Sequence, residues 1–184
     1  MTLTKTPICD FGKKAENFSL KSTENKTISL NDVRGKNGTL IMFICNHCPY
    51  VKAVINDIVN DSNILKKEGI NFLAIMSNDV KNYPEDSFEN MISFSKLHNF
   101  SFPYLIDDTQ KIAKDYDAVC TPDFFGYNKN LELQYRGRIR ELKDLKPITT
   151  GDSDLRIAME LVATSGKGPT KQVPSMGCNI KWFE

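Results

Sequence analysis

The sequence has no run of 18 consecutive apolar residues, so nothing in it resembles a membrane-spanning helix. It also lacks an excess of charge, because 24 Lys and Arg residues stand against 23 Asp and Glu residues and leave a formal charge of +1. That balance gives no field for nucleic acid or anionic lipid, and we expect neither as a partner. Residues 1–7 lack the apolar segment of a secretory signal, so we expect a soluble, cytoplasmic protein, with an oxidising compartment as the alternative.

Cysteine is scarce, and its spacing argues against a disulfide-stapled scaffold. The cysteines form an odd set of five with a single close pair: Cys9, Cys45, Cys48, Cys120 and Cys178. Secreted scaffolds carry an even and dense set, whereas one close pair in a reducing compartment indicates redox chemistry or metal binding. A chain of 184 residues buries about two thirds of its unfolded surface without such staples. We predict a single domain over residues 1–184, with an extended C-terminal tail from about residue 164.

The hydrophobic pattern predicts an α/β fold with a central mixed sheet flanked by helices. Residues 39–44 are almost all apolar, which is typical of a strand covered on both faces. From Pro49 to Leu65 apolar residues recur every three or four positions, the spacing of a helix that packs one face on a core. Residues 70–76 predict a second buried strand, so the order strand, helix, strand predicts a parallel crossover.

Shorter segments extend this plan. The pattern predicts an N-terminal β-hairpin, a helix, an inserted strand-helix segment and an antiparallel hairpin, at residues 15–20 with 27–30, 84–92, 102–106 with 109–116, and 123–127 with 131–136. A last helix is expected to begin at Asp152 as its N-cap. The tail from about residue 164 has no strong period, and we expect it to wrap the surface or the site.

The close cysteine pair frames the segment Cys45-Asn46-His47-Cys48, where the buried strand ends and the helix begins. Thiols at this spacing close a small disulfide ring, so a mixed disulfide on one is released by the other. Amides at a helix N-terminus favour a thiolate, and we expect the pKa of Cys45 to lie below the ordinary value of about 8.5. His47 as a cation would stabilise the reduced pair, and Pro49 suits the first helical position.

Two other interpretations of the pair are a chance set of buried thiols and half of a zinc or copper site. Cys9, Cys120 and Cys178 show no second close pair and the other histidine is His98, so we predict no metal and no cofactor. We interpret His98 as a structural or surface residue at a helix end. The basic run at residues 136–140 is expected to be a solvated strand edge.

The chain resembles the thioredoxin superfamily, in particular its peroxiredoxin-like branch of AhpC/TSA and redoxin-domain proteins. The resemblance covers most of the chain and is carried by residues 15–20, 43–51, 120–122 and 174–182. It implies a thioredoxin-like fold. It also implies a cis peptide bond between Thr121 and Pro122 that lies against the active cysteines, where the backbone of Thr121 pairs with an extended substrate.

The chain departs from the motifs of both the peroxiredoxins and the thioredoxins at specific positions. The peroxiredoxins it resembles place their peroxidatic cysteine at Cys48, with a proline seven positions earlier and Thr or Ser three positions earlier, where Ile41 and Cys45 stand here. Their activating arginine has no match at residues 120–123. Thioredoxins bury an acid six positions before the first cysteine, and Thr39 occupies that position here.

We therefore carry three functional hypotheses. The first is a thiol-disulfide oxidoreductase in which Cys45 attacks a disulfide and Cys48 resolves the mixed disulfide. The second is a thiol peroxidase in which Cys48 becomes a sulfenic acid and Cys45 resolves it. The third is a redox-sensing or metal-carrying binding module.

The expected partners follow from these hypotheses. They are a disulfide-containing protein or small-thiol substrate, peroxide in the second hypothesis, and an upstream thiol reductant. Cys120 and Cys178 are possible additional thiols, for which we favour a buried structural role over a redox role.

Overall fold

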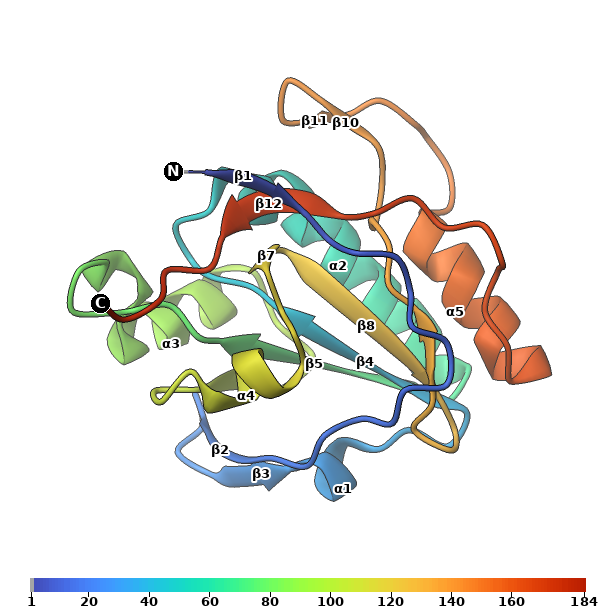
Figure 1. Cartoon of the computed structure of the whole chain (residues 1–184), viewed down its shortest axis with the longest axis horizontal. Helices are drawn as coiled ribbons and strands as arrows, with labels where there is room; N and C mark the ends of the chain where they lie inside the picture. The colour runs from blue at the N-terminus through green and yellow to red at the C-terminus, as the bar shows by residue number, and fades with distance from the viewer. Residues whose placement is uncertain (1) are drawn as a thin grey trace.

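A mixed sheet of seven strands forms the centre of the molecule (Figure 1). The computed structural model describes residues 2–184, and the strand order of this sheet is β3-β2-β6-β5-β4-β8-β9. Strand β5 pairs in parallel with β4 and β6, and the remaining pairs are antiparallel. The strands of this sheet are β2 (Ser19–Ser22), β3 (Thr27–Ser29), β4 (Gly38–Phe43), β5 (Ile70–Met76), β6 (Tyr104–Ile106), β8 (Asp123–Asn128) and β9 (Leu133–Tyr135).

Helices cover both faces of this sheet. They are α1 (Leu30–Val33), α2 (Pro49–Lys67), the 3-10 helix η1 (Pro84–Asp86), α3 (Phe88–Leu97), α4 (Lys111–Asp115) and α5 (Asp154–Ser165). Alternation along β4 sends Leu40 and Met42 to one face, where they pack with α2, α3 and α5. Ile41 and Phe43 point to the other face and pack with α1 and α4. Two buried cores thus hold β4 in place, and β4 leads directly into the cysteine pair.

The chain ends form a second sheet with a strand from the middle of the sequence. Its order is β1-β12-β7, made of β1 (Leu3–Lys5), β12 (Met176–Asn179) and β7 (Cys120–Thr121). Figure 1 shows β12 running beside β1, next to β7 and the start of α2. A short hairpin, β10 (Leu142–Lys143) with β11 (Lys146–Pro147), completes the strands. In residues 2–184 no helix has the length and apolar character that crossing a bilayer requires.

Most of the predicted elements are present. The mixed sheet with flanking helices, the N-terminal hairpin and the inserted strand-helix segment are confirmed as the sheet, β2-β3 and β6-α4. The predicted N-cap Asp152 is wrong, because the cap of α5 is Ser153, whose side chain accepts a hydrogen bond from the backbone N–H of Arg156. The tail lies against the site, as expected, because Cys178 contacts Cys48, and the structure adds the strand β12 within it. A four-residue strand paired on both edges leaves no long periodic pattern to detect.

The prediction that the basic run at residues 136–140 forms a solvated strand edge is also wrong. Arg136 is buried and pairs with the fully buried carboxylate of Asp123 at 3.0 Å, while its guanidinium lies over the ring of Phe125. Arg140 is buried as well and forms two hydrogen bonds to Asp57. These arginines neutralise acids inside the fold, which a count of charges along the sequence does not reveal.

We predict that Arg136→Met destabilises the protein by about 3–5 kcal/mol, because it leaves the buried Asp123 carboxylate without its partner. Urea unfolding at neutral pH measures this loss. Arg138→Ala is the matched control, since Arg138 pairs with the half-exposed Asp154 and the change costs less than about 1 kcal/mol. Equal losses in the two variants would contradict the structural role of the buried pair.

Candidate active site

The cysteine pair occupies the turn between β4 and α2. Pro49 is the first residue of α2 and Cys48 is its N-cap, so Cys48 lies at the amide end of a 19-residue helix. Pro49 suits this position because its missing N–H would have no helical partner there. Cys45 and Cys48 are both almost completely buried, with 1% and 0% of their surfaces exposed. The site is therefore closed in this conformation.

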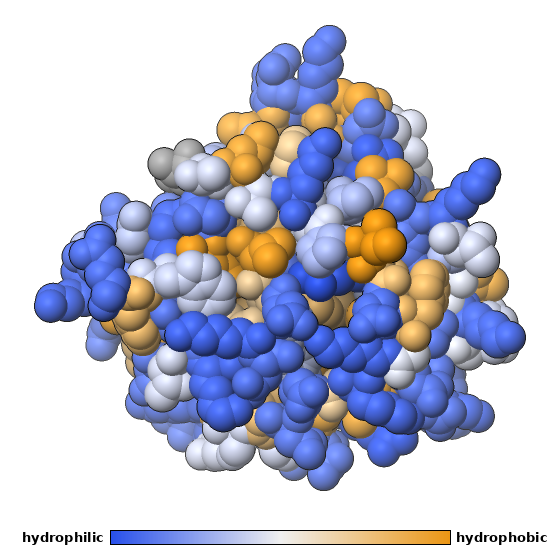
Figure 2. Space-filling view, in the orientation of Figure 1, coloured by the Kyte–Doolittle hydropathy of each residue, from blue (hydrophilic) through white to orange (hydrophobic). Residues whose placement is uncertain are grey.

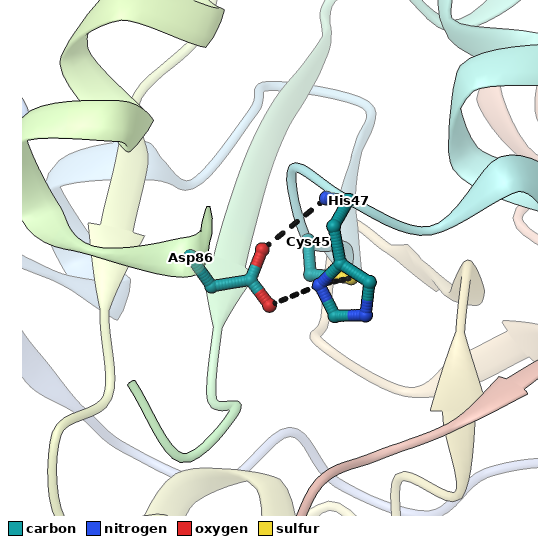
Figure 3. Close-up of side chains that lie close together, drawn as sticks. All are labelled: Cys45, His47 and Asp86. Atoms are coloured by element: carbon teal, nitrogen blue, oxygen red, sulfur yellow. Dashed lines mark hydrogen bonds and ion pairs between the residues drawn. The ribbon is translucent and has the colours of Figure 1, made fainter. Parts of the chain in front are cut away.

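The carboxylate of Asp86, at the end of η1, fixes this turn (Figure 3). It accepts hydrogen bonds from the backbone N–H groups of Asn46 at 2.8 Å and His47 at 3.3 Å. Its second oxygen lies 2.7 Å from Nδ1 of His47 and accepts a bond from the Asn78 side chain at 2.8 Å. Burial opposes ionisation of Asp86, but the bonds from His47 and Asn78 outweigh it and hold its pKa below the ordinary value. Asp86 is thus a charged anchor for the turn.

His47 lies between this carboxylate and the first cysteine. Its Nδ1 atom is 3.9 Å from the sulfur of Cys45, and its ring stacks on Tyr83 at 5.7 Å between centroids. The hydrogen bond to Asp86 raises the pKa of His47 against the opposing effect of burial. The imidazolium form therefore persists to higher pH than in an exposed histidine. Its other nitrogen, Nε2, is buried and makes no hydrogen bond within residues 2–184.

Asn46 has a positioning role in the same turn. Its side chain donates to the carbonyl oxygen of Glu85 at 3.1 Å and accepts a hydrogen bond from the hydroxyl of Tyr104 at 3.0 Å. These bonds tie the turn to η1 on one side and to β6 on the other. Each of the predicted residues 45–49 therefore has a defined place.

The loop at Thr121 and Pro122 packs against both cysteines. The Thr121–Pro122 peptide bond is cis, as the resemblance predicted. The hydroxyl of Thr121 lies 3.4 Å from the sulfur of Cys45, and a protonated Cys48 thiol donates to the carbonyl oxygen of Thr121 at 3.1 Å. This loop therefore forms part of the wall around both sulfurs.

The two thiols of the pair differ in acidity. A hydrogen bond from Cys45 lowers the pKa of Cys48 to about 5, although burial opposes this shift. Thr121, Cys178 and a backbone amide in the first turn of α2 add further bonds that favour the thiolate. Because Cys45 donates to that thiolate and is buried, its own pKa is raised well above the ordinary value. The predicted low pKa of Cys45 is wrong, since the helix end and most of the donors meet Cys48.

The remaining cysteines have different surroundings. The sulfur of Cys178, in β12, lies 3.1 Å from the sulfur of Cys48, and burial raises the pKa of Cys178 to about 12. Cys120 is buried in β7, where its thiol donates to the carbonyl oxygen of Pro122 at 3.5 Å and burial raises its pKa. Cys9 is half-buried outside the site, and burial raises its pKa to about 11. Among the possible additional thiols, Cys178 is the one in contact with the pair.

Cys45, His47 and Asp86 also offer three donor atoms that lie within 4.8 Å of one another. Thiolate, imidazole and carboxylate are ligands that zinc accepts, but structural zinc sites use four protein ligands. No ion is needed to explain the arrangement, because the ion pair between His47 and Asp86 already satisfies the carboxylate. The metal-carrying hypothesis stays a hypothesis.

Sequence reasoning missed three residues of the site. Asp86 lies 39 positions from His47 and Tyr104 lies 58 positions from Asn46, while Asn78 supports the turn through its bond to Asp86. Nothing in the local pattern marks them, although the short acidic stretch before a predicted helix was a weak signal for Asp86. The acid that thioredoxins bury at the position of Thr39 is absent here, and Asp86 brings a buried carboxylate to the site from another element.

Comparison with known proteins identifies a family and several similar proteins. The model of the AhpC/TSA family matches residues 11–142. A crystal structure of an uncharacterized conserved protein from Geobacillus kaustophilus is 40% identical, with a TM-score of 0.94, and the match covers 100% of this chain and 97% of that one. The thioredoxin domain of a thiol-disulfide oxidoreductase from Bacteroides vulgatus is 16% identical, covers 68% of this chain and 86% of that one, and has a TM-score of 0.58. The last match shows the thioredoxin-like fold alone.

A curated relative has a stated activity. The thiol-disulfide oxidoreductase ResA of Bacillus subtilis is 27% identical over 117 residues, which are 64% of this chain and 61% of the relative. This chain therefore spans less than two thirds of the length of that relative.

We predict that ultraviolet titration of the reduced protein shows one thiolate forming with a midpoint near pH 5. Cys48→Ser should remove this transition. Cys45→Ser should keep it, because the serine hydroxyl still donates to Cys48. Cys9→Ser, outside the site, is the control and should leave the curve unchanged. A low-pH transition that survives in Cys48→Ser and disappears in Cys45→Ser would place the thiolate on Cys45.

We also predict that Asp86→Asn lowers the pKa of His47 and weakens the fold. The pKa of His47 is raised in the folded state, so its contribution to stability is complete below its ordinary pKa of about 6.5 and is lost as the pH rises through the raised value. The pKa of Asp86 is lowered, so its contribution is lost at the acid end, as the pH falls below about 4. The destabilisation by Asp86→Asn, about 1–3 kcal/mol, should therefore be largest between these limits.

Urea unfolding of both proteins across the pH range measures this window, and NMR titration of the imidazole measures the pKa. Asp152→Asn removes a surface partner of Arg156 and is the control. An unchanged imidazole titration in Asp86→Asn would rule out the proposed coupling.

Proposed function

The chain belongs to the AhpC/TSA family, and from that premise we propose that it is a thiol-disulfide oxidoreductase whose working centre is the Cys45–Cys48 pair. The observation that carries the proposal is the Cys45–Cys48 dithiol between β4 and the N-terminus of α2, with both sulfurs against the cis-proline loop. A thiolate is the nucleophile in disulfide exchange, and a second thiol at this spacing resolves the mixed disulfide. The activity of ResA and its relatives supports the same reaction class.

The order of attack follows from the acidity of the thiols. In the proposed reaction the Cys48 thiolate attacks a substrate disulfide, and one substrate sulfur leaves as a thiolate that takes the proton of Cys45. The Cys45 thiolate then attacks the sulfur of Cys48, which forms the Cys45–Cys48 disulfide and releases the second substrate sulfur as a thiolate. An upstream thiol reductant restores the pair. This order reverses the one expected from the sequence, where Cys45 attacks first.

A groove beside the site gives a substrate a place to bind. It has a volume of about 290 Å³ and lies between the first turns of α2, Pro122, residues 138–142 and the start of β12. The face shown in Figure 2 is otherwise largely hydrophilic, with hydrophobic residues in small separate patches. The groove is lined by the apolar residues Tyr50, Val54 and Ile139 and by charged groups such as Arg138, so it offers both kinds of contact to a bound chain. Because both sulfurs are buried, a protein substrate reaches them only when a covering segment moves.

A thiol peroxidase is the second candidate, and the acidity of Cys48 favours it. In that reaction the Cys48 thiolate attacks a peroxide oxygen and becomes a sulfenic acid while water or an alcohol leaves. Cys45 then attacks the sulfenic sulfur, water leaves and the same disulfide forms. The aligned position of Cys48 agrees with this chemistry, while Ile41 and Cys45 replace the proline and threonine of peroxiredoxins.

We predict that Cys48→Ser abolishes reduction of a disulfide-bonded test protein such as insulin in the presence of a dithiol reductant. Cys45→Ser should lower the steady rate about 10-fold or more, because the mixed disulfide loses the resolving thiol of the pair. Cys9→Ser should retain the wild-type rate. Wild-type activity in Cys48→Ser would refute the proposal, and a stable mixed disulfide on Cys45 in that variant would reverse the order of attack.

The peroxidase alternative is decided in the same preparations. Consumption of hydrogen peroxide that is as fast as disulfide reduction and is lost in Cys48→Ser would favour it. Peroxide consumption no faster than that of an ordinary thiol would leave the oxidoreductase proposal in place.

A further inference from the structure

The C-terminal strand β12 brings a third cysteine to the reacting sulfur. Cys178 lies opposite Thr121 in the pairing of β12 with β7, next to the cis peptide bond that contacts the pair. Its sulfur is 3.1 Å from the sulfur of Cys48, which is about 1 Å longer than a disulfide bond. A small displacement of either side chain would bring the two sulfurs into bonding contact.

This approach is built into the strand. A side chain at Gly177 would place its Cβ atom 2.0 Å from the carbonyl oxygen of Thr121, so the close contact requires glycine. The hydroxyl of Ser175 donates to the carbonyl oxygen of Pro122 at 2.8 Å, and Ser175 exchanges two further bonds with Thr6. The tail is thus held against the cis-proline loop on one side and against the N-terminal strand on the other.

The other end of the strand is held as well. The backbone N–H of Asn179 donates to the carbonyl oxygen of Thr2, and the backbone N–H of Lys181 donates to the side chain of Asn78. Asn78 in turn donates to Asp86, the anchor of the cysteine turn. The position of Cys178 is therefore coupled through two residues to the same carboxylate that positions Cys45 and Cys48.

We propose that Cys178 is a third redox thiol, which exchanges with the Cys45–Cys48 disulfide to give a Cys48–Cys178 disulfide. This inference rests on the proposed function. In the exchange the Cys178 sulfur attacks the Cys48 sulfur, the bond to Cys45 breaks, and Cys45 leaves as a thiolate that takes the proton lost by Cys178. No electrons enter or leave. In the same way Cys178 resolves a mixed disulfide on Cys48, with the substrate sulfur as the leaving group.

Cys120 provides the contrast. It is buried next to Cys178 in the paired register, but its thiol contacts the carbonyl oxygen of Pro122. Burial raises the pKa of Cys120, and its contact is with a carbonyl oxygen rather than with the sulfur of Cys48. We therefore assign the redox role to Cys178 and keep Cys120 as a structural thiol.

Peptide mapping tests the proposal without any substitution. Trypsin separates the relevant cysteines, because Cys45 and Cys48 share the peptide of residues 37–52 while Cys178 lies in residues 172–181 and Cys120 in residues 115–129. We expect wild-type protein equilibrated with oxidised and reduced glutathione, acid-quenched and alkylated, to contain the cross-link between peptides 37–52 and 172–181 together with the Cys45–Cys48 ring.

Variants separate the two steps. In Cys45→Ser treated with oxidised glutathione, the Cys48–Cys178 disulfide should be the major oxidised species. In Cys45→Ser with Cys178→Ser, glutathione should stay on Cys48. Cys45→Ser with Cys120→Ser is the matched control and should still form the cross-link.

A Cys45→Ser variant that keeps glutathione on Cys48 while Cys178 is fully alkylated would overturn the inference. If the wild type still forms the Cys45–Cys48 ring and reduces insulin, the proposed function stands in that case. Absence of both the ring and the activity would instead refute the proposed function.

Discussion

The buried carboxylate of Asp86 is the interaction on which the site depends. It accepts hydrogen bonds from two backbone amides of the cysteine turn and from the side chains of His47 and Asn78. A buried carboxylate without such partners would cost several kcal/mol, so its four bonds define one arrangement of the turn. With the turn held in this way, Cys48 becomes the N-cap of α2 and Cys45 faces it as a donor.

The same network joins segments that are distant in the chain. Through Asn78 the carboxylate is linked to the backbone of Lys181, just beyond β12, and through Asn46 the turn is linked to Tyr104 in β6. The cis peptide bond before Pro122 closes the other side. The acidity of Cys48 is therefore a property of the assembled fold, because its donors come from α2, from the cis-proline loop and from the tail. In a low-dielectric interior such bonds are stronger than they are in water.

How much the sequence predicts depends on how local each feature is. The strands 39–44 and 70–76, helix α2 and the cysteine pair are encoded in contiguous patterns, and the resemblance supplied the cis bond at Pro122. Asp86 and the distribution of acidity between Cys45 and Cys48 depend on residues far apart in sequence, so no periodicity or spacing reveals them. Arg136 was misjudged for the same reason, because its partner Asp123 lies on the neighbouring strand and both are buried. The single domain and the cytoplasmic location stay predictions.

Burial of the sulfurs connects access to reactivity. Cys48 is covered by the cis-proline loop, which leads directly into β8 of the main sheet. It is also covered by β12, whose Cys178 contacts the Cys48 sulfur. The loop is constrained by β8 and by the Asp123–Arg136 pair, and β12 is constrained by its pairing with β1 and β7. Any displacement of β12 that uncovers Cys48 also withdraws the Cys178 thiol, one of the donors that favour its thiolate. Such a displacement also exposes Cys48 to water and so reduces the burial that raises its pKa, whereas a small oxidant that enters without displacing β12 meets the full set of donors.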